Sequence, residues 1–289
     1  MFHIIIWSPT VNIRLHQSLL EKMYSLCFTK PVIFSSKALI LSYKNRTQLR
    51  DLYNAATTGF RKQSFQPKIL SLFINPFFFI RRLLYITIKK KAPILNGKLL
   101  DFGCGRKPYH NLFIVDEYIG VDVEITGHSH KNSKIDIYYN GKDLPFANNL
   151  FDSVFCGEVI EHLMNPEEVL PELYRVMKPK GRMLLTVPFC WNEHEMPFDY
   201  ARYSSAGIQH LLQKHGFTIL SHEKIGTFAR VCFQLVALYF FELFKKWGKL
   251  GFIISMLFII PVNIFGLILL PFIPANHTLY FTNILVIEK

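Results

Sequence analysis

The sequence has few cysteines, and its leading third is poor in acidic residues. The cysteines are Cys27, Cys104, Cys156, Cys190 and Cys232, an odd number with no C-x-x-C pair. This pattern excludes a disulfide framework and a zinc site built on paired cysteines, and it indicates reduced thiols in a cytoplasmic setting. Residues 1–98 contain 16 lysines and arginines against two acids, whereas the rest of the chain has 17 basic and 19 acidic residues. The net charge of +12 therefore comes from a basic leading segment.

A basic leading segment suits two kinds of partner, nucleic acid or an anionic membrane face. Residues 69–91 favour the membrane, because bulky apolar residues there are interrupted by Arg81 and Arg82 and closed by Lys89 to Lys91. In an interfacial helix, each such cation contributes roughly 1 kcal/mol near anionic lipid. The alternative is an amphipathic helix packed on the core, with solvated lysines. Nucleic acid is not expected, because the aromatic residues form apolar blocks instead of alternating with cations for base stacking.

A short apolar run ends in Asp101-Phe-Gly103-Cys-Gly105, and a second ends in Gly120-Val-Asp122, 21 residues after the first acid. Such runs are typical of buried parallel strands. Glycines let a ligand approach the backbone, and an acid at the tip of the second strand takes a ribose diol, so this layout predicts a nucleoside-binding crevice. The third glycine of a G-x-G-x-x-G motif is missing, and Asp101 would repel a pyrophosphate. Both observations favour S-adenosylmethionine over NAD.

Further motifs follow in order: Leu144-Pro-Phe, Phe151-Asp-Ser-Val, Glu158-Val-Ile-Glu-His162-Leu, and Val176-Met-Lys-Pro-Lys-Gly. Together with the two strand ends, this succession resembles the small class I methyltransferase domain called type 11, which uses S-adenosylmethionine. The resemblance covers about residues 94 to 225 and the last expected strand. The set as a whole is specific, although no single motif would carry the resemblance.

The resemblance implies roles for individual residues. The residues implied to line the methionine end of the cofactor are Asp101, Gly103 and Gly105. Asp122 would hold the ribose hydroxyls. Asn140 stands where such domains often have an aspartate that meets the adenine amino group, so the charge is missing there. Glu158 follows the fourth strand, where the family's active-site loop begins.

Strand patterns alternate with helical patterns, which predicts an α/β fold with a parallel sheet covered on both faces. The expected strands lie at about residues 98–102, 118–122, 135–139, 152–156, 182–188, 217–223 and 279–287. The expected helices lie near 107–114, 163–177 and 204–215, the last ending at Gly216 as a C-cap. The resemblance implies a Rossmann-like sheet of seven strands with the last one antiparallel. Residues 1–93 then form a basic N-terminal extension, and 94–289 form the methyltransferase domain, in which 226–278 are a hydrophobic helical insertion.

The loop after the fifth strand contains the candidate catalytic residues, outside the carboxyl end of a strand where open α/β sheets bind ligands. His194 is a candidate general base, because an imidazole titrates near neutral pH and can take a proton from a hydroxyl. Glu195 or Glu193 could orient it or replace it. The candidates for binding polar groups of the substrate are Asp199, Tyr200 and Arg202.

His162 follows Glu158 by four residues, which places both on one face of an expected helix. It is a further catalytic candidate, or a polar neighbour of the cofactor. A metal is not expected at Glu193, His194 and Glu195, because adjacent residues of a strand point to opposite faces. Methyl transfer depends mostly on positioning, and proximity can supply about 7–11 kcal/mol of the barrier.

Residues 251–273 form a run of 23 residues without a charge, long enough to span a membrane. A return of the chain to the sheet at 279–287 argues against a single crossing. Pro261 and Asn263 are expected to break the run into two half-length helices, so a shallow or re-entrant hairpin is the preferred interpretation. The alternatives are a lid over the active site, a contact with a second subunit, and a two-span crossing that begins at residue 229.

These observations predict an S-adenosylmethionine-dependent methyltransferase on the cytoplasmic side of a membrane, with the 251–273 segment as a peripheral, re-entrant or anchoring element. The expected acceptor is a hydroxyl of a lipid-linked or membrane-associated small molecule, and the resemblance suggests surface polysaccharide synthesis. One alternative is a methyltransferase of a soluble small molecule, with the hydrophobic hairpin as a lid or a homodimer contact. The other is a non-catalytic membrane adaptor that keeps the fold.

Overall fold

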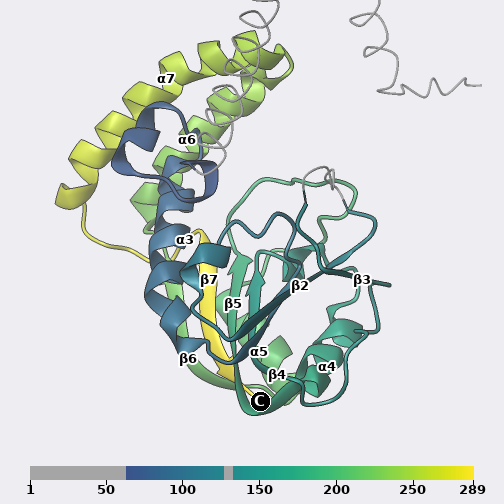
Figure 1. Cartoon of the computed structure of the whole chain (residues 1–289). Coiled ribbons are helices and arrows are strands. Elements are labelled where there is room, and N and C mark those ends of the chain that lie inside the picture. The colour runs from purple at the N-terminus through teal and green to yellow at the C-terminus, as the bar shows by residue number, and fades with distance from the viewer. Residues whose placement is uncertain (1–62, 127–132) are drawn as a thin grey trace, which may run out of the picture. The chain divides into compact units, whose positions relative to one another are not determined.

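The computed structural model describes residues 63–126 and 133–289, which are built around one seven-stranded sheet (Figure 1). The strands are β1 (Lys98–Phe102), β2 (Glu117–Val123), β3 (Ile137–Tyr139), β4 (Phe151–Gly157), β5 (Met177–Pro188), β6 (Thr218–Ile225) and β7 (Thr282–Glu288). Their order is β3-β2-β1-β4-β5-β7-β6, and all pairs are parallel except those of β7, which runs antiparallel to β5 and β6. The predicted Rossmann-like sheet with an antiparallel last strand is confirmed.

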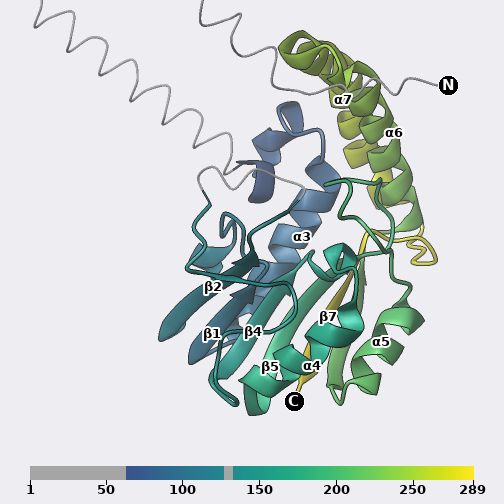
Figure 2. The same cartoon turned by 90° about the vertical axis from the view of Figure 1, so that its right-hand side faces the viewer.

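Helices cover both faces of this sheet, as expected (Figures 1 and 2). Helices α4 (Pro166–Val176) and α5 (Ser205–Lys214) lie on one face, and α3 (Phe78–Lys91) lies on the other. Because successive side chains of a strand point to opposite faces, Leu100 packs in the cluster of α4 and α5 whereas Leu99 packs with α3. Short 3₁₀ turns complete the fold: η1 (Ile69–Phe73), η2 (Ala92–Ile94), η3 (His110–Leu112), η4 (Ile160–His162) and η5 (Leu270–Phe272).

Local sequence signals set the bounds of α4 and α5. Helix α4 begins with Pro166 at its first position and has acidic residues in its first turn, where they interact favourably with the helix dipole. Helix α5 begins after Ser204, whose hydroxyl accepts a hydrogen bond from the backbone N–H of Gly207 at 3.1 Å. Gly216, with φ of 87°, follows the end of α5 and leads into β6, as the sequence predicted.

Two predicted helical segments differ from the structure. The stretch expected to be helical near 107–114 contains only η3, because Lys107 has φ of 51° and Pro108 has no N–H to donate. Glu158 also has a positive φ, 57°, and the 3₁₀ turn η4 follows it. Glu158 and His162 therefore do not share the face of an α-helix.

Residues 69–91 were expected to form an interfacial helix, with packing on the core as the alternative. Helix α3 packs on the core, where Leu84 and Ile88 lie against the sheet. The apolar side chains that remain exposed in this segment belong chiefly to η1, in which Leu70 is 73% exposed. Helix α3 belongs to the same compact unit as the sheet, and the predicted division of the chain at residue 93 stays a prediction. The structure of residues 1–62 lies outside the described residues.

The hydrophobic insertion forms a helical hairpin of α6 (Phe228–Lys245) and α7 (Gly248–Leu269), between β6 and β7 (Figure 2). Pro261 does not divide α7, which is one helix of 22 residues, so the prediction of two half-length helices is wrong. A proline removes one backbone hydrogen bond, and the apolar residues around it continue the helix. Gly251 allows the two helices to meet closely, since a Cβ there would lie 1.9 Å from the backbone oxygen of Phe244.

Candidate active site

A cavity of about 900 Å³ lies at the carboxyl ends of β1, β2 and β4. This is the edge at which open α/β sheets bind ligands, and the volume is that of a small-molecule site. The predicted cofactor residues that line the cavity are Asp101, Gly103, Gly105, Asp122 and Glu158. The sequence thus identified one wall of the cavity, and the binding of a cofactor by these residues stays a prediction.

The turn after β1 is built on glycine backbone. Gly103 has φ of 71°, and a Cβ there would lie 2.4 Å from Cγ2 of Val159, so a side chain cannot be placed at this position without a shift. The backbone N–H of Gly105 donates to Oδ2 of Asp122 at 2.8 Å. This hydrogen bond ties the turn to the tip of β2 and fixes the floor of the cavity.

Asp101 is a buried carboxyl at the cavity wall. Its side chain is 4% exposed and accepts a hydrogen bond from the hydroxyl of Tyr118. Burial raises the pKa of Asp101 to about 7, although the hydrogen bond from Tyr118 and the nearby charge of Lys107 act in the opposite direction. A cationic ligand beside Asp101 would favour its ionised form.

Asn140 is not among the described residues that line the cavity. Its side-chain oxygen accepts hydrogen bonds from the backbone N–H groups of Lys142 and Asp143, at 2.9 and 2.7 Å. The cavity wall in this region is instead formed by its two chain neighbours, Tyr139 and Gly141. Asn140 therefore shapes a turn beside the cavity, and the interaction with the adenine stays a prediction.

Glu158 lies at the end of β4 and lines the cavity. Oε1 of the Glu158 carboxyl accepts a hydrogen bond from the hydroxyl of Thr186 at 2.9 Å. The backbone N–H of Glu158 donates to the backbone oxygen of Thr186 at 3.0 Å. Burial raises the pKa of Glu158 against the effect of that hydrogen bond. Two contacts with β5 thus hold a buried carboxyl at the junction of the cofactor wall and the active-site loop.

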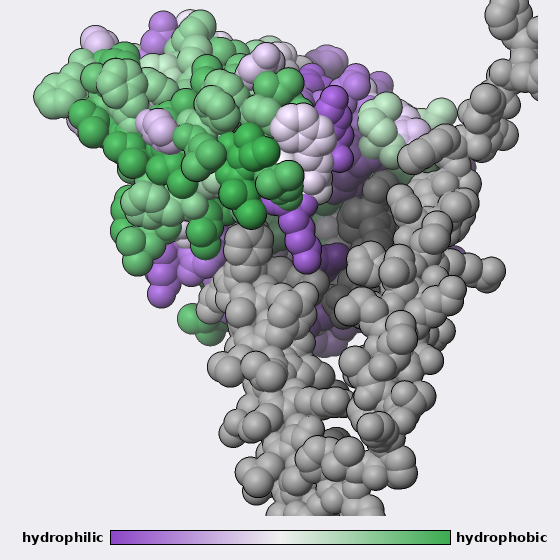
Figure 3. Space-filling model, turned by 90° about the horizontal axis from the view of Figure 1, so that it is seen from above, coloured by the Kyte–Doolittle hydropathy of each residue, from purple (hydrophilic) through white to green (hydrophobic). Residues whose placement is uncertain are grey.

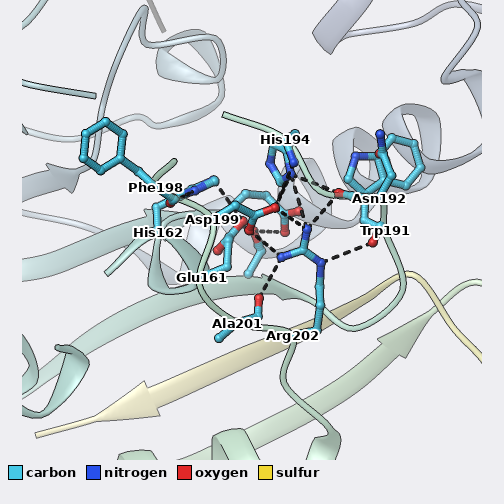
Figure 4. A network of polar contacts seen from close by, with 11 residues as sticks. Glu161, His162, Trp191, Asn192, His194, Phe198, Asp199, Ala201 and Arg202 are labelled. Atoms are coloured by element: carbon cyan, nitrogen blue, oxygen red, sulfur yellow. Dashed lines mark hydrogen bonds and ion pairs between the residues drawn. The ribbon is translucent and has the colours of Figure 1, made fainter. Parts of the chain in front are cut away.

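An ion pair holds the base of the loop after β5 (Figure 4). Arg202 donates hydrogen bonds to both carboxylate oxygens of Asp199, at 2.6 and 2.7 Å, and to the backbone oxygens of Asn192 and Trp191. Burial alone would raise the pKa of Asp199, but the hydrogen bonds from Arg202 and from the backbone N–H of His194 outweigh it and lower the pKa to about 2. Asp199 is therefore ionised at neutral pH.

The three predicted substrate residues have different positions. Tyr200 lines the cavity. Asp199 and Arg202 are not among the described residues that line it, and their polar atoms are engaged with each other and with the loop backbone. Asp199 and Arg202 therefore hold the loop backbone, and the binding of substrate by the three residues stays a prediction.

His194 and Glu195 both line the cavity, together with the glycine turn after β1. Nδ1 of His194 lies 3.3 Å from Oδ2 of Asp199 and 3.3 Å from the backbone oxygen of Asn192. Burial, followed by the proximity of His162, lowers the pKa of His194. The imidazole is thus neutral at neutral pH, which is the form that accepts a proton or binds a metal.

His162 lies against His194, with 4.9 Å between the ring centroids (Figure 4). Its Nδ1 is 2.7 Å from the backbone oxygen of Phe198, and its Nε2 is 3.7 Å from Oε1 of Glu161. Glu161 is completely buried, and its pKa is raised by that burial and by the nearby Glu158. Glu161 was not among the site residues predicted from the sequence. The spacing Glu-x-x-Glu-His, followed by a later histidine, could have indicated it as a candidate.

A second wall of the cavity comes from residues that the sequence analysis assigned elsewhere. Arg81 and Ile80 of α3 line it together with Phe65 and Trp191. The guanidinium of Arg81 lies 4.7 Å from the centre of the Phe65 ring. No motif marked these residues, because a pattern of apolar residues and cations is the same for a membrane-binding helix and for a helix that packs on a sheet.

The seven-stranded sheet and the cavity at its carboxyl edge have the arrangement that the resemblance to class I methyltransferases implied. Residues 100–185 match the family model described as a methyltransferase domain, which agrees with the predicted resemblance and with S-adenosylmethionine as the cofactor of that class. The matched segment runs from within β1 to within β5 and includes the glycine turn and His162.

Known relatives share this part of the chain. An uncharacterized protein of Methanocaldococcus jannaschii is 34% identical over 105 residues, which are 35% of this chain and 45% of that protein. A ubiquinone biosynthesis O-methyltransferase of Thiobacillus denitrificans is 26% identical over 110 residues, 32% of this chain and 45% of the relative. A solved S-adenosylmethionine-dependent methyltransferase of Archaeoglobus fulgidus aligns with a TM-score of 0.46 and 16% identity, over 71% of this chain and 92% of that one. The chain spans about half the length of the curated relatives it matches.

Proposed function

We propose that this chain is an S-adenosylmethionine-dependent O-methyltransferase whose acceptor is a lipid-linked or membrane-associated small molecule, reached from the cytoplasmic side of a membrane. One observation carries the catalytic part: the glycine turn with Asp101 and Asp122, and the loop with His194 and Glu195, line the same cavity. The relative named a ubiquinone biosynthesis O-methyltransferase supports transfer to oxygen.

The residues present fit S-adenosylmethionine. Asp101 is a buried carboxyl, and a cationic methionine moiety beside it would offset the cost of its desolvation. Asp122 lies at the tip of β2, where an acid accepts hydrogen bonds from ribose hydroxyls. Gly103 and Gly105 of the turn after β1 line the cavity, and the positive φ of Gly103 is a conformation that favours glycine. Asn140 offers no negative charge to the adenine amino group. The adenine would instead contact apolar and aromatic side chains of the cavity wall, such as Tyr139.

S-adenosylmethionine, when bound, supplies a methyl group on a sulfonium, and its transfer to a hydroxyl oxygen releases one proton. Two groups of this chain can accept that proton at the cavity wall, the neutral imidazole of His194 and the carboxylate of Glu195. Tyr200 and Trp191 line the same region and can hold the acceptor. The loop presents these groups in a fixed arrangement because the Asp199–Arg202 ion pair holds its base.

The outer face of the α6–α7 hairpin supports attachment to a membrane. Figure 3 shows apolar surface gathered over this part of the molecule, with polar residues at its border. Helix α7 with η5 is long and apolar enough to cross a membrane, and it is the one such helix among the described residues. The exposed apolar side chains of α7 are Leu250, Ile253, Leu257, Phe258, Ile264, Phe265 and Ile268. The turn between the helices adds the exposed cations Lys245, Lys246 and Lys249, which suit anionic lipid.

The inner face of the hairpin packs on the cavity wall. A Cβ at Gly266 of α7 would lie 2.8 Å from the Phe79 ring of α3, and the next residues of α3, Ile80 and Arg81, line the cavity. The hairpin leaves the sheet after Ile225 and returns at the start of β7, the edge at which the parallel strands end (Figures 1 and 2). An acceptor held in lipid beside the hairpin is thus close to the cavity.

A soluble acceptor is the second candidate, with the hairpin as a lid or a dimer contact. No residue of α6 or α7 is among the described residues that line the cavity, so a lid has no support in this conformation. The membrane experiment below distinguishes attachment to a membrane from a dimer contact through the exposed face of α7.

Calorimetric titration with S-adenosylmethionine tests the catalytic part. We expect binding by the purified protein, and a loss of at least about tenfold in affinity for two variants. Asp122→Ala removes a charge-assisted hydrogen-bond acceptor, and Gly103→Val displaces the turn after β1 because its side chain collides with Val159. Asp116→Ala is the matched control, because Asp116 is exposed and does not line the cavity. Absence of binding by a folded wild-type protein would overturn the enzyme and favour the adaptor.

Flotation with phosphatidylglycerol vesicles tests the membrane part. We expect the protein to float with the vesicles, and the double variant Ile253→Glu/Leu257→Glu to lose affinity on the order of a hundredfold, since each buried apolar side chain contributes about 1.5–3 kcal/mol. The control is Ile114→Glu/Leu220→Glu, which adds the same charges at exposed apolar positions outside the hairpin. A wild-type protein that stays monodisperse without detergent and does not float contradicts the membrane proposal, and a dimer would support the soluble alternative.

A further inference from the structure

We propose that Glu161, His162 and His194 form a binding site for one divalent transition-metal cation at the wall of the cavity. One potential ligand atom from each of the three residues lies within 4.8 Å of the other two. Two imidazoles and one carboxylate are a donor set that divalent transition metals prefer. Metal–ligand bonds of about 2.0–2.2 Å place donors roughly 3 Å apart, a distance that small side-chain rotations reach from this arrangement.

Glu161 carries the argument, because its carboxyl is buried without a partner. Its side chain is completely buried, and neither carboxylate oxygen has a hydrogen-bond partner among the described residues. A buried polar group without a partner costs free energy in either protonation state, and a carboxylate costs most. The imidazole of His162 lies beside this carboxyl, with 3.7 Å between its Nε2 and Oε1 of Glu161. A bound cation would satisfy this oxygen.

Both imidazoles are oriented as metal ligands are. Nδ1 of His162 lies 2.7 Å from the backbone oxygen of Phe198, which can only accept a hydrogen bond, so Nδ1 holds the proton and the neutral ring has its lone pair on Nε2. Nδ1 of His194 lies 3.3 Å from two acceptors, the carboxylate of Asp199 and the backbone oxygen of Asn192, and 3.4 Å from one donor, the guanidinium of Arg202. Carboxylates and carbonyls that accept from the second ring nitrogen are the usual partners of metal-binding histidines.

The carboxyls around the three residues do not all have a cationic partner. Asp199 is paired with Arg202, whereas no guanidinium of the described residues donates a hydrogen bond to Glu161. The cluster is also accessible to a ligand, since His162 and His194 line the cavity.

The site lies where the acceptor hydroxyl is expected, and this role rests on the proposed function, whereas cation binding does not. A cation that holds the hydroxyl oxygen lowers its pKa. The lone pair of His194 is then engaged with the cation, so the proton passes from the hydroxyl to the carboxylate of Glu195. The oxygen keeps the electron pair with which it forms the bond to the methyl carbon, while the carbon–sulfur bond breaks and its pair stays on sulfur.

Equilibrium dialysis of the EDTA-treated full chain against Mn²⁺ or Zn²⁺ tests the site without any methyl transfer. We expect one cation per chain, and loss of that cation in Glu161→Gln and His194→Gln. The matched control is His210→Gln on α5, which does not line the cavity and should bind as the wild type does. A wild-type chain that takes up no more cation than Glu161→Gln overturns the proposal.

Thermal unfolding gives a second measurement that remains informative if a histidine variant does not fold. Without metal, Glu161→Gln should be at least as stable as the wild type, because it removes a buried ionisable group of almost the same shape. Addition of Mn²⁺ should raise the Tm of the wild type and leave that of Glu161→Gln unchanged. A wild-type Tm that does not respond, or an equal response of both proteins, contradicts the site. Calorimetry with S-adenosylmethionine in EDTA reports separately on the proposed function.

Discussion

The side-chain oxygen of Gln234 accepts a hydrogen bond from the backbone N–H of Phe79 at 3.1 Å, between α6 and the first turn of α3. The amide nitrogen of Gln234 donates to the backbone oxygen of Pro76 at 2.8 Å. First-turn N–H groups have no partner inside their own helix, so Gln234 caps α3 from a distant part of the chain. One face of α6 is therefore committed to the protein, and the face available to lipid is the opposite one.

We expect Gln234→Leu to destabilise the protein by about 2 kcal/mol, because the buried N–H of Phe79 and the oxygen of Pro76 both lose their partner. Urea unfolding followed by circular dichroism measures the change. Gln213→Leu, at an exposed position of α5, is the control and should stay within about 0.5 kcal/mol of the wild type. Equal stability of the two variants would show that α6 does not support α3.

The sheet and the cofactor wall could be predicted from the sequence because they depend on local, repeated signals. Apolar runs that end in Asp101 and Asp122 mark strand ends, and all parallel strands end at one edge, so neighbouring motifs meet there. Pro261 gave a misleading local signal, because the surrounding apolar residues keep α7 helical on both sides of it. A single proline in a long packed helix costs less than the packing it would interrupt.

The second wall of the cavity, and the cluster of Glu161, His162 and His194, could not be predicted in the same way. Arg81 reaches the cavity only because α3 packs across the sheet, a contact between segments far apart in the chain. From the sequence, a metal site was considered only at the adjacent residues Glu193 to Glu195. In the structure, His194 instead lies beside Glu161 and His162, which follow the end of β4. Spacing in the sequence predicts ligands on one element, but it does not predict which loop faces which.

The protonation of Asp101 makes cofactor affinity depend on pH. Its pKa of about 7 in the free protein falls when a cationic ligand binds, because the cation favours the carboxylate. Below the free pKa, binding must release the proton, so affinity should decrease as the pH falls, by up to about tenfold per pH unit. Calorimetry between about pH 6 and about pH 8 measures the trend, and Asp101→Asn should be flatter. The titration of the ligand itself is common to both proteins, so parallel curves would contradict the role of Asp101.

A side chain at Gly120 should displace the buried Cys104 and the end of the Lys107 side chain. A Cβ at Gly120 would lie 2.3 Å from Cε of Lys107 and 2.7 Å from Sγ of Cys104, and the ammonium of Lys107 pairs with Asp136. Gly120→Ala should therefore destabilise by about 1–3 kcal/mol and weaken S-adenosylmethionine binding, since it displaces the turn after β1. Thermal unfolding and calorimetry measure the two effects. Gly207→Ala, in α5, is the control and should retain cofactor affinity.

The Asp199–Arg202 ion pair should affect catalysis without affecting cofactor binding. Arg202→Lys keeps the charge but loses the two-pronged hydrogen bonding to Asp199 and the donors to the loop backbone. The loop that presents His194 and Glu195 then loses its fixed position, and a displacement of about 1 Å lowers the rate by up to about a hundredfold. We expect kcat to fall in this range, in a methyl-transfer assay with a hydroxyl acceptor, while the calorimetric Kd for S-adenosylmethionine stays constant. Arg182→Lys, which changes an exposed arginine near Glu288, should leave both quantities unchanged. An equal loss of cofactor affinity in Arg202→Lys would instead place the ion pair in the support of the cofactor wall.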